Sequence, residues 1–278
     1  MESKVIFLDI DGTLTLPGQN EPPKSAIRAI KKARERGHYV FLCTGRSYGM
    51  LLPLLKYDFD GIIASAGSYV EYQNEVLVNC PVTEEKKHLA METLKENGIF
   101  RTVECMDGSY TDEEFKDFLR AHSHEGNNSE LLRWREQIEQ SLNVFPMKEY
   151  KGQPVYKIIV VCSSQAQLKK PREVLEDDFV FSISGQDEYG FINGELINKR
   201  FHKGKALRLM CGHLGIPISE SIAFGDSIND KEMLEIAGLS ICMENGQEQV
   251  KKIADEVCPS VLEDGIWHAF FKHKLIEN

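Results

Sequence analysis

Two aspartates, Asp9 and Asp11, follow the apolar run Val5–Leu8 near the start of the chain. Two carboxylates held a few ångströms apart repel each other, and burying them without a partner costs several kcal/mol. A hard divalent cation removes this cost, and Mg²⁺ takes one or two carboxylates while leaving positions for phosphate oxygens. Alternation along a strand directs side chains at i and i+2 the same way. The pair therefore predicts half of a metal site, whereas the alternative is that both aspartates only cap the following turn.

A second polar group follows the apolar run YVFLC. Thr44, Gly45 and Arg46 come directly after it, where a strand is expected to turn toward a helix. The hydroxyl of Thr44 and the backbone N–H groups of such a turn can hold a phosphate. The tripeptide is common by itself, so it gains weight only together with Asp9 and Asp11.

A third polar group follows the apolar run SIAFG. It contains Asp226 and Asp230, with Ser227 and Asn229 available to cap the next helix. Lys203 stands just before an amphipathic helix, where its positive charge opposes the helix dipole, so helix formation does not explain it. Each residue taken singly is compatible with a solvated helix end, but their joint occurrence indicates one shared site.

These residues need a scaffold that brings strand ends together. Residues 5–64 alternate short apolar runs with helix-period segments, a βαβαβ pattern that builds a parallel sheet with right-handed crossovers. Ligands of such sheets bind at the carboxyl ends of the strands, where the aspartates are expected. The same alternation returns after Lys203. The sequence therefore predicts an α/β fold, with a Rossmann-like parallel-sheet core and helices on both faces.

The middle of the chain has a different pattern. A hairpin is predicted to turn near Gln73 and Asn74, and from Thr83 to Gln186 helical segments mix with strand-like runs. The length of 278 residues indicates about two domains. We therefore expect an α/β core interrupted by an inserted α+β domain with its own sheet. The expected core covers residues 1–82 and 187–278, and the expected insertion covers residues 83–186.

The motifs resemble those of the haloacid dehalogenase (HAD) superfamily, specifically the Cof-type phosphatases with a large inserted cap of class IIB. The segments DIDGT (9–13), TGR (44–46) and GDSIND (225–230), together with Lys203 in HKGKAL, agree with its four motifs in order and spacing. The resemblance spans the chain and is specific for the core. In the middle third it rests mainly on position and length.

The resemblance implies a role for each aspartate. Asp9 would be the nucleophile that forms an aspartyl-phosphate, and Asp11 would be the general acid and then the general base. Mg²⁺ would be held by Asp9, the backbone carbonyl of Asp11 and Asp226. Asp230 would orient Asp226 or a metal-bound water.

The resemblance also implies the residues that bind the substrate. Thr44, Gly45, Lys203 and Asn229 would hold the phosphate oxygens, where charge lies in the transition state. The insertion would close over the site as a lid, so substrate choice should depend on residues 83–186.

Two positions depart from the pattern of related sequences. Ala66 in SAGSY replaces an asparagine, which could remove a polar contact near the substrate. Glu244 in MENG replaces a glycine and puts a bulky charge where little room is expected. Neither departure affects the four motifs.

The composition narrows the functional classes. The net charge of −10 and the lack of basic blocks longer than two residues argue against nucleic acid as a partner. No apolar stretch approaches the roughly 20 residues of a membrane helix, and the N-terminus shows no secretory leader. Seven cysteines, an odd number without a C-x-x-C pair, indicate reduced thiols. We therefore expect a cytoplasmic protein that contacts no membrane.

Three functions are compatible with these residues. The leading one is a Mg²⁺-dependent phosphatase acting on a small phosphorylated metabolite, with a sugar phosphate as the expected class. A phosphomutase would use the same aspartates but return the phosphoryl group to a second hydroxyl. A non-catalytic module would bind a phosphorylated ligand, although it needs neither a nucleophile nor an acid. The sequence specifies neither the substrate nor the oligomeric state, monomer or homodimer.

Overall fold

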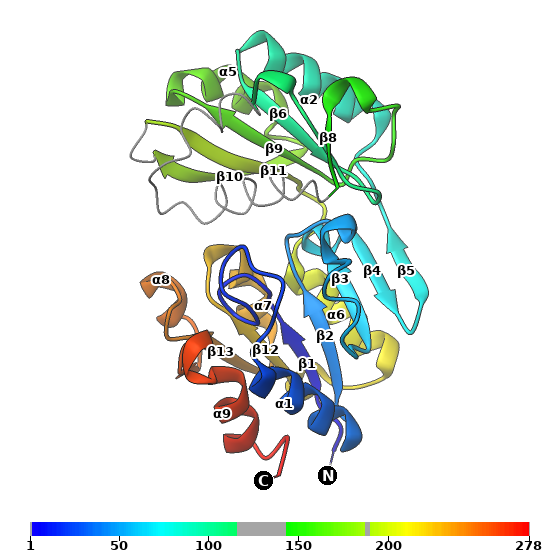
Figure 1. The fold of residues 1–278 in the computed structure, drawn as a ribbon, viewed down its shortest axis with the longest axis vertical. Helices are drawn as coiled ribbons and strands as arrows, with labels where there is room; N and C mark the ends of the chain where they lie inside the picture. Colours follow the sequence, from blue (N-terminus) through cyan, green and yellow to red (C-terminus); the bar gives the residue numbers. More distant parts are fainter. Residues whose placement is uncertain (1, 116–142, 187–189, 278) are drawn as a thin grey trace. The chain divides into compact units, whose positions relative to one another are not determined.

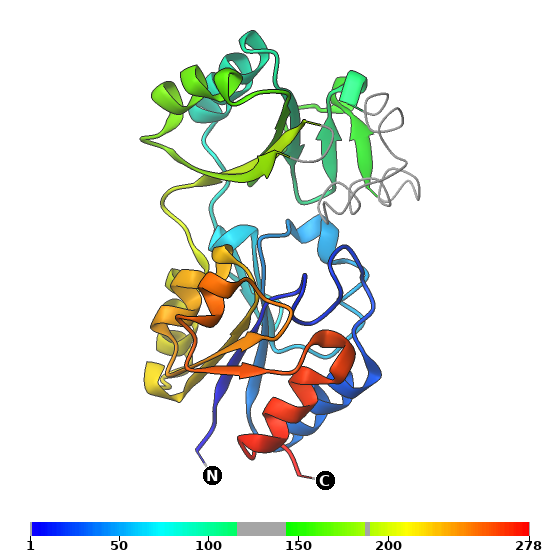
Figure 2. The ribbon, with the colours of Figure 1, turned by 90° about the vertical axis from the view of Figure 1, so that its left-hand side faces the viewer.

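The computed structural model describes residues 2–115, 143–186 and 190–277, and the chain forms two compact units (Figures 1 and 2). The first unit contains Met1–Arg46, Leu51–Asn79 and Phe201–Asn278, and the second contains Ser47–Met50 and Cys80–Arg200. The sequence predicts that the insertion ends at 186, whereas the second unit continues to Arg200. The reason is that Ile192–Asn198 forms a strand that pairs within the second unit.

The first unit is built on an eight-stranded sheet. In order across the sheet, its strands are β14 (Glu256–Cys258), β13 (Leu239–Met243), β12 (Ser221–Gly225), β1 (Val5–Leu8), β2 (Tyr39–Cys43), β3 (Gly61–Ala64), β4 (Tyr69–Tyr72) and β5 (Glu75–Asn79). The strands from β14 to β3 are parallel, and β4 and β5 add an antiparallel hairpin. This hairpin turns at Gln73 and Asn74, both with positive φ, as the sequence predicts.

Helices cover both faces of this sheet (Figure 2). They are α1 (Lys24–Glu35), α6 (Lys203–Leu214), α7 (Lys231–Ile236), α8 (Glu248–Lys251) and α9 (Gly265–Lys272). Buried side chains of α6, α7 and α8 form one core with those of the central strands. On the other face α1 packs against α9. The predicted α/β core with helices on both faces is confirmed.

The start of α6 is fixed by close packing against α7. A Cβ atom on Gly204 would lie 2.4 Å from the carbonyl oxygen of Glu232, so only glycine allows this approach. Leu207, Met210 and Cys211 are buried on the face that packs on the sheet, as their spacing predicts. The first residue of α6, Lys203, is therefore held rigidly at the edge of the sheet where the parallel strands end.

The second unit has its own six-stranded sheet, as the sequence predicts. In order, its strands are β10 (Phe179–Gln186), β11 (Ile192–Asn198), β9 (Lys157–Cys162), β6 (Phe100–Glu104), β7 (Ser109–Thr111) and β8 (Val144–Pro146). All neighbours are antiparallel except β7 and β8. The helices α2 (Glu84–Glu96) and α5 (Gln165–Leu175) pack against one another, and a single apolar core joins them to the sheet.

Short 3₁₀ helices connect several of these elements. They are η1 (Tyr48–Leu51), η2 (Ser65–Gly67), η3 (Met147–Glu149), η4 (Ile218–Glu220), η5 (Ile228–Asp230) and η6 (Val261–Glu263). Two of them, η2 and η5, follow β3 and β12 at the carboxyl edge of the first sheet. Within the described ranges, none of the helices has both the length and the apolar character needed to cross a bilayer.

Candidate active site

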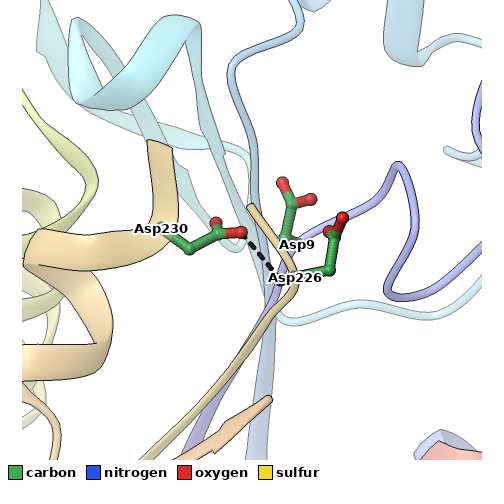
Figure 3. A group of neighbouring side chains, drawn as sticks. All are labelled: Asp9, Asp226 and Asp230. Atoms are coloured by element: carbon green, nitrogen blue, oxygen red, sulfur yellow. Dashed lines mark hydrogen bonds between the residues drawn. The ribbon is translucent and has the colours of Figure 1, made fainter. Parts of the chain in front are cut away.

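The carboxyl ends of β1 and β12 bring two acids together. These neighbouring strands are parallel and in register, with Leu8 opposite Phe224. The N–H of Asp9 donates to the carbonyl of Phe224 at 3.1 Å, which continues the ladder by one residue. Asp226 follows β12 directly, and Figure 3 shows the carboxylates of Asp9 and Asp226 on the same side of the strand ends.

Lys203 links Asp9 with Asp230. Its ammonium donates to Oδ1 of Asp9 and to Oδ1 of Asp230, at 2.6 Å in each case. The Lys203 side chain is only 1% exposed. Burial disfavours its charge, but Asp230 and Asp9 outweigh this effect and raise the pKa of Lys203. Lys203 therefore stays charged and neutralises part of a buried acidic cluster.

The carboxylate of Asp230 is engaged through both of its oxygens. While Oδ1 accepts from Lys203, Oδ2 accepts from the N–H of Asp226 at 3.0 Å, the dashed line in Figure 3, and from the N–H of Ser227 at 3.2 Å. A Cβ atom on Gly225 would lie 2.6 Å from the side chain of Asp230. Asp230 thus fixes the turn after β12 and the backbone of Asp226.

The loop after β1 packs directly on the Asp226 carboxylate. The hydroxyl of Thr13 donates to Oδ1 of Asp226 at 3.1 Å. Gly12 has a φ of 83°, and a Cβ atom there would lie 2.4 Å from Oδ2 of Asp226. Only glycine allows both this conformation and this approach. The Gly-Thr step of the first motif therefore holds the acid of the fourth motif.

The crowding of these acids disfavours their ionised forms. Burial, followed by the neighbouring Asp230, raises the pKa of Asp9 to about 7 despite its bond to Lys203. Burial, followed by Asp9 and Asp230, raises the pKa of Asp226 to about 8. One lysine therefore does not balance three carboxylates, of which those of Asp9 and Asp230 are buried and that of Asp226 is partly buried.

The donor set fits a hard divalent cation. Carboxylate oxygens of Asp9, Asp226 and Asp230 lie within 4.8 Å of one another. Asp230 already accepts three hydrogen bonds, so Asp9 and Asp226 are the two carboxylates best placed to hold an ion. Oxygen donors and excess negative charge suit Mg²⁺, which is commonly bound by one or two carboxylates.

Mg²⁺ is expected to raise the melting temperature of the protein, and more strongly at pH 8.5 than at pH 6. Because the pKa values of Asp9 and Asp226 are raised, the folded protein retains protons that the unfolded chain has released, so stability falls between about pH 4 and pH 8. Mg²⁺ offsets this loss by replacing the protons. At 100 times its Kd an ion stabilises by about 2.7 kcal/mol, or about 5–10 °C.

Scanning calorimetry with Mg²⁺ and with EDTA measures this rise in melting temperature. Asp226→Asn should remove most of it, because one of the two proposed ligands loses its charge. An equal rise at both pH values would contradict competition between protons and the metal.

The carboxylate of Asp11 belongs to a separate ion pair. Nε of Arg46 donates to its Oδ2 at 2.8 Å, and Nη2 donates to its Oδ1 at 2.7 Å. The N–H of Gly18 donates to the same Oδ1 at 2.9 Å. The sequence predicts a common direction for Asp9 and Asp11, but β1 ends at Leu8, so strand alternation does not extend to Asp11. Metal binding by the Asp11 carbonyl stays a prediction.

The residues predicted to bind phosphate lie at neighbouring element ends. Asn229, which is exposed, lies 3.5 Å through its Oδ1 from Nζ of Lys203. A Cβ atom on Gly45 would lie 3.8 Å from the amide nitrogen of Asn229. The hydroxyl oxygen of Thr44 accepts from the N–H of Arg46 at 3.1 Å, which leaves the hydroxyl hydrogen to donate elsewhere.

The loop after β13 accommodates Glu244, the residue that replaces the glycine of the family pattern. Glu244 is exposed, so its charge faces solvent. The next residue, Asn245, donates through Nδ2 to the carbonyl of Gly12 at 2.6 Å and accepts at Oδ1 from the N–H of Val261 at 3.3 Å. Asn245 therefore ties the loop after β1 to the loop after β13.

Ala66, at the other position that departs from the family pattern, has an unfavourable backbone conformation. Its φ and ψ of 56° and 26° lie in the left-handed region, and its N–H donates to the carbonyl of Thr44 at 3.0 Å. An L-residue pays roughly 1–2 kcal/mol for this conformation, which glycine and asparagine tolerate better. The backbone contact to Thr44 is thus kept although the amide side chain is absent.

Ala66→Gly is expected to raise the free energy of unfolding by about 1 kcal/mol, because glycine adopts the left-handed conformation without this penalty. Chemical denaturation measures the change. Ala29→Gly is the matched control: Ala29 is buried in α1, where glycine should instead lower stability by about 1 kcal/mol. A destabilised Ala66→Gly variant would contradict the assignment of strain to this residue.

Sequence reasoning gave no role to two residues of this edge, Arg46 and Asn245. A signal existed for Arg46, because it belongs to the TGR segment, one of the polar groups that directly follow the apolar runs. Asn245 gave a weaker signal as an Asn-Gly step after a strand. Their partners, Asp11 and Gly12, became evident only from the loop conformations.

Comparisons with known proteins agree with this geometry. Residues 6–270 match the haloacid dehalogenase-like hydrolase family. The chain belongs to this family. The predicted family is therefore confirmed, and the protein is an enzyme of the hydrolase class.

Individual relatives extend this assignment. Phosphatase YwpJ of Bacillus subtilis is 28% identical and covers 98% of this chain and 100% of its own. The 5-amino-6-(5-phospho-D-ribitylamino)uracil phosphatase YwtE of the same organism is 26% identical, with 98% of both chains covered. A solved HAD subclass IIB sugar phosphatase has a TM-score of 0.74 at 23% identity and covers 99% of this chain and 100% of its own. The last similarity shows that this HAD hydrolase shares that fold.

Proposed function

We propose that this HAD hydrolase is a Mg²⁺-dependent phosphatase that hydrolyses a small phosphorylated metabolite through an aspartyl-phosphate on Asp9. One observation carries the proposal: the buried ammonium of Lys203 holds Asp9 beside Asp226 at adjacent strand ends. A carboxylate that attacks an anionic phosphate needs positive charge around it. The family and the phosphatase names of the relatives support the same reaction.

In the first step, the Asp9 carboxylate attacks phosphorus. A bond forms between its oxygen and phosphorus while the bond from phosphorus to the leaving oxygen breaks. Lys203 engages Oδ1 of Asp9, so Oδ2 is the oxygen that we propose to attack. Asp11 in its protonated form gives the leaving oxygen its proton, so the product departs as a neutral alcohol.

In the second step, water attacks phosphorus of the aspartyl-phosphate. Asp11, now a carboxylate, accepts a proton from this water as the bond between phosphorus and Asp9 breaks. Inorganic phosphate leaves, and the Asp9 carboxylate is regenerated. Covalent catalysis thereby divides one slow hydrolysis into two faster steps.

The phosphate oxygens would be held by donors from three element ends. These are the hydroxyl of Thr44, the N–H of Gly45, the ammonium of Lys203 and the amide of Asn229. Such donors act most strongly when they face the charge of the transition state. When held by Asp9 and Asp226, Mg²⁺ would screen the repulsion between the carboxylate and the phosphate.

The name of one relative supports the substrate class that we propose. YwtE is named for a phosphate on a ribityl chain, which is a polyol. We assign this chain a sugar or polyol phosphate. The second unit is proposed to choose among such substrates, in line with the expectation for residues 83–186.

A cytoplasmic location belongs to the same proposal. All seven cysteines are free thiols, and most of them are buried. Thiols of this kind are typical of a reducing compartment.

A panel of sugar, polyol, nucleotide and cofactor phosphates, incubated with the purified protein and Mg²⁺, tests the function by release of inorganic phosphate. We expect release that stops with EDTA and requires Asp9. Transfer of the phosphoryl group to a second hydroxyl without free phosphate would identify a phosphomutase instead. Binding without turnover of any compound would identify a binding module.

Asp11→Asn is expected to slow the first step most for substrates whose leaving group has a high pKa, by about 10²–10⁴-fold. Such alkoxides need a proton as they depart. The rate at which p-nitrophenolate, a stable anion, is released in the first step should fall much less. Single-turnover release of p-nitrophenolate and of the alcohol from alkyl phosphates measures the difference, because release of inorganic phosphate also requires the second step, in which Asp11 acts as the base. Equal losses for both substrates would remove Asp11 from the role of general acid.

A further inference from the structure

Arg46 is the largest side chain that is fully buried among the described residues. Burying a guanidinium is costly unless its charge is paired and its donors are satisfied. Besides its two bonds to Asp11, it donates through Nη1 to Oδ1 of Asn20 at 2.6 Å and through Nη2 to the carbonyl of Gln19 at 3.0 Å. All four bonds go to one segment, the loop that follows β1.

The backbone of Arg46 makes one bond within its own loop and one bond to the loop after β3. Its N–H donates to the hydroxyl oxygen of Thr44 at 3.1 Å, and its carbonyl accepts from the N–H of Ser65 at 2.8 Å. Arg46 therefore joins the loops after β1, β2 and β3 at the carboxyl edge of the sheet. Its side chain contacts both carboxylate oxygens of the proposed acid, Asp11.

We propose that Arg46 is a positioning residue for the proton transfer carried out by Asp11. The role rests on the proposed function, in which Asp11 exchanges a proton with the leaving group. A planar guanidinium binds both oxygens of a carboxylate and so fixes the plane of the carboxyl group, which a lysine does not do. Asp11 lies in a loop with 26% of its side chain exposed, so the guanidinium supplies the orientation that a strand would otherwise give.

The same unit contains a matched pair without a catalytic neighbour. Arg34 donates through Nε and Nη2 to the two carboxylate oxygens of Asp60, at 3.0 Å in each case. Asp60 also accepts from the N–H of Val40 at 2.7 Å, which places this pair at the amino ends of β2 and β3. Arg34→Ala removes the same bidentate contact at the opposite edge of the sheet.

A double-mutant cycle between Arg46 and Asp11 tests the proposal. Arg46→Ala should slow alkyl phosphates by about 10²-fold and p-nitrophenyl phosphate much less, the same leaving-group dependence as for Asp11→Asn. The double variant should be no slower than Asp11→Asn alone, because both changes remove one function. Arg34→Ala should lower the melting temperature and leave the leaving-group dependence unchanged.

Added guanidinium distinguishes positioning from loop stability. Millimolar guanidinium should restore part of the rate of Arg46→Ala on alkyl phosphates, and it should not help the double variant. Arg46→Lys keeps the charge but not the bidentate contact, so it should retain the leaving-group dependence of Arg46→Ala. If Arg46→Ala does not fold, the Arg46→Lys variant takes its place in the cycle with Asp11→Asn.

The outcomes separate this role from the proposed function. The positioning role is wrong, and the phosphatase function stands, if the wild type releases phosphate and the rate losses of the Arg46 and Asp11 variants multiply in the double variant. The same conclusion holds if the Arg46 variant slows all substrates equally, whatever their leaving group. If the wild type releases phosphate from no compound, the function is wrong and the role falls with it.

Discussion

Asp9→Asn is expected to lower kcat by about 10⁴-fold or more, while inorganic phosphate still binds in the presence of Mg²⁺. The amide has the same shape and can still accept the hydrogen bond from Lys203, but it is a poor nucleophile toward phosphorus. Removing one of the crowded carboxylates also relieves repulsion with Asp226, whose pKa Asp9 helps to raise. The variant should therefore be at least as stable as the wild type when no metal is added.

Release of inorganic phosphate measures kcat, and isothermal titration calorimetry with inorganic phosphate measures binding. Asp60→Asn is the matched control, because it makes the same substitution at the amino ends of the strands. It should lose stability and keep its kcat. Turnover by Asp9→Asn above about a tenth of the wild-type rate would contradict the assignment of Asp9 as the nucleophile.

The strand ends could be predicted because parallel sheets obey a simple rule. Each apolar run ends in a polar group, and right-handed crossovers bring those ends to one edge. This rule brings Asp9 and Asp226 to the same edge, and the structure adds that β1 and β12 are neighbouring strands there. The position of Lys203 follows as well, since the start of the amphipathic helix that precedes β12 lies at the same edge. The apolar runs therefore determine the centre of the site.

The loops could not be predicted in the same way. The direction of Asp11 depends on where β1 stops, and one residue of difference changes which group the carboxylate meets. The bond from Asn245 to Gly12 joins segments more than two hundred residues apart, and no local pattern specifies it. The end of the second unit differed from the prediction because pairing of β11 with β9 is likewise a long-range contact.

Lys203→Met is expected to lower the free energy of unfolding by about 3–5 kcal/mol and kcat by at least about 10²-fold. The lysine lies between Asp9 and Asp230, and both are buried, so its removal leaves their charges without a cation. Mg²⁺ should recover part of the stability, because the ion supplies positive charge to Asp9. It should not recover the rate, since the donor to the phosphate oxygens is gone.

Two further variants separate the stabilising role of Lys203 from its catalytic role. Lys205→Met, on the exposed side of the same helix, should change neither stability nor kcat appreciably. Adding Asp230→Asn to Lys203→Met removes one of the two charges that lost their partner, so the double variant should be more stable than Lys203→Met while its kcat stays low. Recovery of kcat together with stability would show instead that Lys203 acts only by holding the fold. If stability recovers without the rate, the ammonium itself serves the reaction, because the carboxylate of Asp9 is then present in a stable fold and still fails to turn over substrate.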